Sequence, residues 1–245
     1  MDDTSRRQSL STARVLDLAL LVMTAGTSSL LAMQAVRGDW FPPEVSISQY
    51  GVGETGWMLT MTLLLMALAS ALLLVGHYRQ AGAPTLSVLL PWTIWTLALV
   101  VMAFVPTNEW PGPLSLTGQI HQGAAIFGLF FAPIGAVAMA GIARRDSPKS
   151  TAARARVVAI ACAGLSWFFL TLLVLTNIDI DVTGLGYQDA WSLHQTVAVV
   201  LDIIVVFALI ICLRARERRT TAQATPSWVT LSPPQDTQST QPSTQ

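Results

Sequence analysis

The sequence predicts an all-α integral membrane protein, a six-helix transmembrane bundle with both termini in the cytoplasm. Apolar residues make up 52% of the 245 residues and charged residues only 11%, whereas soluble proteins carry about 25% charged residues. The mean hydropathy is +0.54. Six apolar stretches each approach the ~20 helical residues that cross a ~30 Å hydrocarbon core. So little charge cannot cover a water-facing surface, which excludes an ordinary soluble protein.

The six spans are apolar on all sides, unlike the alternating strands of a membrane barrel. The first follows basic residues, as a signal peptide does, but its apolar run is too long for one, so we interpret it as a retained helix. We expect the spans at 15–36, 56–76, 86–105, 121–142, 157–177 and 193–213. Three parts follow: a cytoplasmic segment (1–14), a membrane domain (15–213) and a cytoplasmic tail (214–245). The tail is basic at first, and from residue 220 it is too poor in apolar residues to order itself.

The positions of the basic residues predict the orientation. Cytoplasmic loops of membrane proteins are rich in Lys and Arg. Of the 14 such residues, all but Arg37 fall on the side that holds both termini. The opposite, outer side is acidic, with Asp39, Glu44, Glu54, Glu109, Asp179, Asp181 and Asp189. These acids either keep the outer loops soluble or form a vestibule that attracts cations.

Asp202 is the most informative single position, because it lies near the middle of the last span. An isolated charge there costs at least ~2.5–3.5 kcal/mol, so the side chain is expected to face the bundle interior and to find a polar partner. It is either a protonatable group on a transport path or a structural hydrogen bond between helices. The candidate partners at similar depth are Ser166, Trp167, Thr24, Thr27 and Ser28. Asp17, by contrast, is expected to pair with Arg14 in its own helical turn.

Two histidines form a second candidate site on the outer side. Thr107-Asn108 precedes His121-Gln122, and Thr176-Asn177 precedes His194-Gln195, so two successive hairpins share a plan that places the histidines at one depth. Histidine suits a proton relay, a metal site or haem ligation, with Glu109, Asp179 and Asp181 as acidic neighbours. The structural alternative is that both histidines cap or solvate helix ends. We assign no metal, cofactor or catalytic residue.

The fourth span carries a ridge of small residues at every fourth position, formed by Ala124, Gly128, Ala132, Ala136 and Ala140. Small residues allow close approach of a second helix in a membrane. The ridge is expected to pack inside the bundle, with a homo-oligomer interface as the alternative. The proline in this span, and Pro91 in the third, should bend their helices.

Motifs typical of common enzyme classes are absent from the sequence. It contains no G-x-S-x-G elbow, no H-E-x-x-H helix and no phosphate-binding loop. The basic residues form short clusters beside apolar spans, which does not resemble a nucleic-acid surface. The expected partners are membrane lipids and an unknown small solute, ion or lipid.

Several short motifs resemble a known bacterial family. They are Ile47-Ser48-Gln49-Tyr50-Gly51 before Gly56-Trp57, Val105-Pro106-Thr107-Asn108 leading through Gly118 to Ile120-His121, and Gly184-Leu185. Over about residues 15–213 the chain resembles the multi-pass membrane family catalogued as domain of unknown function 998. The chain departs from the family pattern at Asn108, where an acid is expected after Pro-Thr, and at Tyr187-Gln188, where a basic residue is expected. The resemblance implies a helical membrane bundle and brings no established activity.

The leading functional hypothesis is a non-enzymatic protein that binds or moves a small solute, ion or lipid in the outer half of the bundle. Asp202 would be its buried titratable group, with His121, His194, Glu109 and Asp179 at the entrance. The alternatives are a membrane-embedded enzyme that acts on lipid or envelope precursors, and a non-catalytic assembly or sensory partner.

Overall fold

The computed structural model of the protein describes residues 3–108, 113, 115–142, 150–178, 180 and 182–223. All of the regular secondary structure in this part of the chain is helical. The helices are α1 (Asp3–Arg37), a short 3₁₀ helix η1 (Ile47–Gly51), α2 (Gly56–Ala81), α3 (Leu86–Phe104), α4 (Leu116–Ile142), α5 (Thr151–Asn177) and α6 (Tyr187–Gln223).

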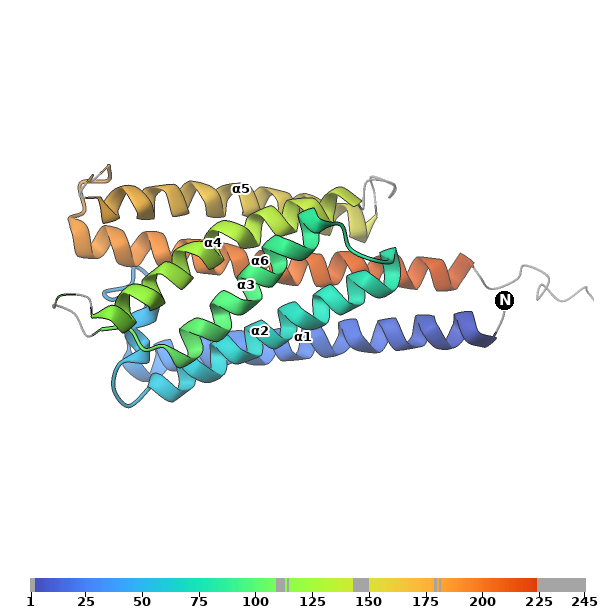
Figure 1. The fold of residues 1–245 in the computed structure, drawn as a ribbon, viewed down its shortest axis with the longest axis horizontal. Coiled ribbons are helices and arrows are strands. Elements are labelled where there is room, and N and C mark those ends of the chain that lie inside the picture. The colour runs from blue at the N-terminus through green and yellow to red at the C-terminus, as the bar shows by residue number, and fades with distance from the viewer. Residues whose placement is uncertain are drawn as a thin grey trace, which may run out of the picture.

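The six long helices lie side by side along the longest axis of the molecule (Figure 1). Each packs against its neighbours in the chain, and α1 also contacts α6, which closes the ring. Helix α6 additionally contacts α2 and α4 and is the most buried of the six helices. We call the end where α1 begins and α6 finishes the basic end, since it carries Arg79, Arg154 and Arg214. The other is the acidic end, with Asp39, Glu44, Glu54 and Asp189.

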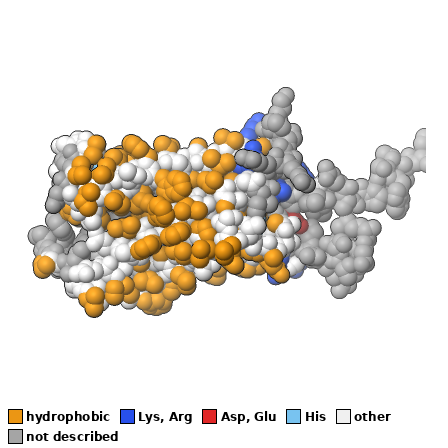
Figure 2. Space-filling view, turned by 45° about the horizontal axis from the view of Figure 1, so that its top comes forward, with side chains coloured by type: hydrophobic (Ala, Val, Ile, Leu, Met, Phe, Trp, Pro, Cys, Tyr) orange, Lys and Arg blue, Asp and Glu red, His pale blue; other side chains and the backbone are white. Residues whose placement is uncertain are grey.

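All six helices are long and apolar enough to cross a membrane, which confirms the predicted number of spans. Large apolar side chains such as Leu97, Phe127 and Phe168 are more than half exposed along the middle of the bundle. Figure 2 shows this apolar surface, with Lys and Arg gathered near the basic end. A surface of this kind suits a lipid environment, so the chain is a multi-pass membrane protein.

Five of the six long helices run beyond the predicted spans, and the two largest extensions, in α1 and α6, are at the basic end. Helix α1 begins at Asp3, ahead of the expected start at residue 15, and α6 continues through the basic residues after Leu213 to Gln223. The rest of the tail, from residue 224, lies outside the described residues. A polar segment can extend a helix whose apolar part is already packed, because each added residue needs no new nucleation.

The predicted small-residue ridge of α4 packs inside the single chain. A Cβ built on Gly128 would lie 3.0 Å from the Ala98 side chain of α3. Further along the same face, Ala132, Ala136 and Ala140 are buried. The ridge therefore lets α3 and α4 approach closely, as small residues do in membrane helices.

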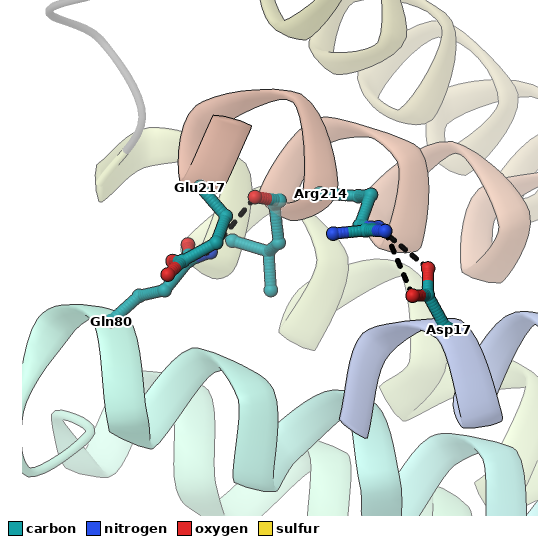
Figure 3. A network of polar contacts seen from close by, with 5 residues as sticks. Asp17, Gln80, Arg214 and Glu217 are labelled. Atoms are coloured by element: carbon teal, nitrogen blue, oxygen red, sulfur yellow. Dashed lines mark hydrogen bonds and ion pairs between the residues drawn. The ribbon is translucent and has the colours of Figure 1, made fainter. Parts of the chain in front are cut away.

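Polar contacts join three helices at the basic end (Figure 3). Arg214 of α6 pairs with Asp17 of α1, with Nε 2.6 Å from one carboxylate oxygen and Nη2 donating to the other at 2.8 Å. Gln80 of α2 donates to the Leu213 carbonyl oxygen and to Glu217. The expected pairing of Asp17 with Arg14 is wrong: α6 extends far enough to bring Arg214 to the carboxylate, which it meets through one hydrogen bond from Nη2 and an ion-pair contact from Nε.

Candidate functional site: a two-part cavity at the acidic end

The segment between α1 and α2 folds over the acidic end and is fixed by Asp39. Its carboxylate accepts hydrogen bonds from the backbone N–H groups of Glu44 and Val45, and from the Tyr50 hydroxyl at 2.8 Å. Arg37 lies over the Tyr50 ring. Burial, together with the hydrogen bond to Asp39, raises the pKa of Tyr50, because both disfavour the phenolate. We call these contacts of Asp39 with Glu44, Val45 and Tyr50 the clasp. The clasp holds η1 against the ends of the long helices.

Beneath η1 is a cavity of about 90 Å³, which we call the polar pocket. Its walls come from η1, α4, α5, α6 and Thr107 at the end of α3. Most of the lining side chains can form hydrogen bonds, and none of these is Asp, Glu, Lys or Arg: Ser46, Ser48, Gln49, Thr107, His121, Gln122, Tyr187, Gln188, Trp191, Ser192 and Gln195. The Tyr187 and Trp191 rings stack 6.1 Å apart on one side.

A second cavity of about 60 Å³ continues towards the middle of the bundle, and we call it the apolar chamber. Ser48, His121, Ala125 and Gln195 line both cavities, so these residues form their common boundary. The other walls are mostly aliphatic: Leu30, Ile47, Leu59, Leu63, Met66, Leu99, Met102, Leu129, Val199 and Ile203, with Trp95 and Thr62. Neither cavity is lined by a described Asp, Glu, Lys or Arg side chain.

His121 stands on the common boundary in a defined tautomer. Its Nδ1 lies 2.6 Å from the Val105 carbonyl oxygen at the end of α3. A carbonyl can only accept, so Nδ1 carries the proton and Nε2 of the neutral ring keeps its lone pair. His121 therefore offers a hydrogen-bond acceptor to a molecule in the cavity.

Three further side chains of the cavity walls are buried without a hydrogen-bond partner among the described residues. They are the Ser192 hydroxyl and the Gln195 amide oxygen, which line the polar pocket, and the Thr62 hydroxyl in the apolar chamber. An unsatisfied buried polar group costs about 1–3 kcal/mol. Ser192 and Gln195 lie where a polar molecule in the polar pocket can satisfy them.

The structure places His194 away from this cavity. Successive residues of a helix are about 100° apart, so His194 points to a different side of α6 from Gln195. Its Nδ1 lies 3.3 Å from the Thr176 hydroxyl, and its ring is 6.3 Å from that of Phe169, both on α5. Of the two predicted histidines, only His121 lines the cavity.

The two predicted hairpins do share a plan. In each, the histidine near the start of the second helix contacts the end of the first: His121 reaches Val105, and His194 reaches Thr176. The Gln122 amide also donates to the Asn177 side chain at 2.9 Å, which joins the two hairpins directly. The repeated dipeptides thus meet at one end of the bundle, where they tie helix ends together.

Asp202 is fully buried but lines neither cavity. Neither of its carboxyl oxygens has a geometric hydrogen bond in the described part of the chain. Ser166 of α5 lies beside it, as predicted, although the Ser166 hydroxyl donates to the Ala198 carbonyl at 3.5 Å. The other predicted partners point elsewhere: Trp167 donates to the Phe130 carbonyl, and Thr24 and Ser28 are exposed on α1.

The acidic residues predicted beside the histidines, Glu109, Asp179 and Asp181, lie outside the described residues. Within the described ranges, no three His, Cys, Asp or Glu side chains come close enough together to hold a metal ion.

Sequence reasoning missed Ser192, Gln195 and Thr62 as site residues. A signal for two of them exists, since Ser192, Gln195, Val199 and Ile203 recur at helical spacing on one face of α6. That face is polar near the acidic end and aliphatic further in, which matches the change from polar pocket to apolar chamber. Thr62 carries no such signal, because a threonine in an apolar helix commonly bonds its own backbone.

Comparison with known proteins adds a family but no activity. No curated protein and no solved structure matches the chain. The model of one family, described as "Protein of unknown function (DUF998)", matches residues 18–212. This range covers most of the membrane-spanning part and contains the short motifs on which the family resemblance rested. The chain therefore belongs to the DUF998 family of membrane proteins.

Proposed function

We propose that the protein binds a small, uncharged, hydrogen-bonding solute or lipid headgroup in the polar pocket, and that the acidic end faces the outside of the cell. The observation that carries this proposal is a pair of buried polar side chains on the cavity wall, Ser192 and Gln195, whose oxygens have no partner among the described residues. With the acceptor of His121 they provide a donor and two acceptors within one small cavity.

The absence of charge from the described lining argues for a neutral ligand rather than an ion. An ion leaving water needs opposite charge or several strong dipoles to replace its hydration. The described acids of this end do not supply that charge: Asp39 is engaged by the clasp, and Glu44, Glu54 and Asp189 do not line the pocket. Asp202 and His194 also stay outside the proposed site.

The distribution of basic residues supports this orientation. Arg79, Arg154 and Arg214 lie at the end where α1 begins and α6 finishes, and basic residues favour the cytoplasmic side. The pocket would then open towards the periplasm or the extracellular medium, and its ligand would arrive from there or from the outer leaflet.

Imidazole NMR tests the proposal directly, since the chain has three histidines. Protein with ¹⁵N-labelled histidine, in lipid nanodiscs, is titrated with glycerol, acetamide and 1-butanol. A ligand that donates to Nε2 should shift the His121 resonance, which the variant His121→Gln identifies. Gln195→Leu should weaken the response, and His194→Gln should leave it intact because His194 lines neither cavity. No saturable response to any of the three probes would contradict the proposal.

A further inference from the structure

We propose that the two cavities together bind one amphiphile, an uncharged polyol-like headgroup in the polar pocket and a short single alkyl chain in the apolar chamber. This inference rests on the proposed function and specifies the chemical class of its ligand.

The two cavities lie next to each other. The polar pocket and the apolar chamber share Ser48, His121, Ala125 and Gln195 in their walls. The two cavities are therefore adjacent, with only these side chains between them. We infer that one ligand reaches from one space into the other past these side chains.

The chemistry of the walls changes abruptly from one cavity to the other. On α6, Ser192 and Gln195 line the polar pocket, whereas Val199 and Ile203, on the same face, line the apolar chamber. Gln195 and Ile203 are eight residues apart, about 12 Å along a helix. Across the chamber stand Leu59 and Met66 of α2. A water-filled chamber needs several polar partners per water molecule, and the aliphatic walls do not provide them.

The volumes of the two cavities limit the size of the ligand. A cavity needs about 10–15 Å³ for each water-sized group that it holds. The apolar chamber of about 60 Å³ thus holds a chain of about four to six carbons, and the polar pocket of about 90 Å³ holds about six to nine heavy atoms of headgroup. A long diacyl lipid does not fit these dimensions as a whole.

A series of 1-monoacylglycerols tests the inference. Glycerol and its butyryl, hexanoyl and dodecanoyl monoesters are equilibrated by dialysis against the full-length protein in nanodiscs, with empty nanodiscs as the blank. Binding is expressed against the free aqueous concentration. Each added methylene should tighten binding about fourfold, and this gain should stop at about six chain carbons, where the chamber is full. Hexanoate, which places a charge in the uncharged pocket, should bind at least about tenfold more weakly than the hexanoyl ester.

Two neighbouring positions provide matched variants. Val199 lines the apolar chamber, whereas Val200 is 44% exposed on the lipid-facing side of the same turn. Val199→Phe fills the chamber and should remove the dependence on chain length while glycerol still binds. Val200→Phe adds the same bulk outside and should leave the whole series unchanged.

The outcomes separate this inference from the proposed function. If glycerol binds as tightly as the hexanoyl ester, or if Val199→Phe and Val200→Phe behave alike, the amphiphile is refuted while the polar site stands. The same holds if binding keeps tightening up to the dodecanoyl ester. If no member of the series binds and the imidazole titrations also show no shift of the His121 resonance, the proposed binding in the polar pocket is refuted as well.

Discussion

The contact between α3 and α4 gives the sharpest quantitative prediction, for Gly135→Ala. A Cβ at Gly135 would lie 2.8 Å from Cε3 of Trp92, although ordinary contacts begin at about 3.4 Å. Trp92 cannot easily yield, because it is fully buried and its indole N–H donates to the Ser70 carbonyl at 2.8 Å. Overpacking of this kind costs about 1–3 kcal/mol, against a gain of about 0.5–1 kcal/mol from replacing glycine in a helix.

The matched control is Gly123→Ala in the same helix, where a Cβ would meet nothing within 4 Å. It should show only the helical gain, so the two variants should differ by about 1–3 kcal/mol in the free energy of unfolding. Chemical unfolding in one detergent, followed by circular dichroism, measures this difference. Trp92→Phe removes the clashing ring atom and should rescue Gly135→Ala in a double-mutant cycle. Equal stability of the two alanine variants would refute the proposed packing of α3 on α4.

Two other predictions concern buried polar groups outside the cavity. Asp202→Leu keeps the branched shape of the side chain but replaces two oxygens, which have no hydrogen-bond partner among the described residues, by methyl groups, so it should raise the free energy of unfolding by about 1–3 kcal/mol. Asp202→Asn should change the free energy of unfolding little. A loss of stability in the leucine variant alone would show that the carboxyl group has a partner. Tyr50→Phe should cost about 1.5–3 kcal/mol through the lost bond to Asp39. Because the folded pKa of Tyr50 is raised above its ordinary value of 10.0, the phenol stabilises the fold fully below pH 10 and loses this contribution at higher pH. Thermal unfolding from pH 8 to 11 should therefore show a decline in wild type that is weaker in Tyr50→Phe.

The fold was largely predictable because the bilayer imposes it. Length and hydropathy located six spans, since a membrane segment must satisfy its own backbone hydrogen bonds and is therefore helical. The helix ends at the basic end were less predictable. Polar residues such as Arg214 give no hydropathy signal, yet α6 extends through them and pairs with Asp17.

The candidate site was predictable only in part. His121 was singled out, and it lines the cavity. His194 has the same dipeptide context and a similar depth, but it contacts Thr176 instead. The two histidines differ in the direction in which each points from its helix axis into the bundle, and a short motif does not encode that direction. Gln195, next in sequence to His194, occupies the cavity wall for the same reason.

The sequence by itself determined that this chain is a six-span helical membrane protein of the DUF998 family, because hydrophobic length and family motifs are local properties. Only the tertiary structure decided which polar residues share a cavity. Each helix is apolar nearly all round, so its sequence does not distinguish the face towards lipid from the face towards protein. Packing against neighbouring helices makes that choice, and it placed Ser192 and Gln195 on the cavity walls while it buried Asp202 elsewhere.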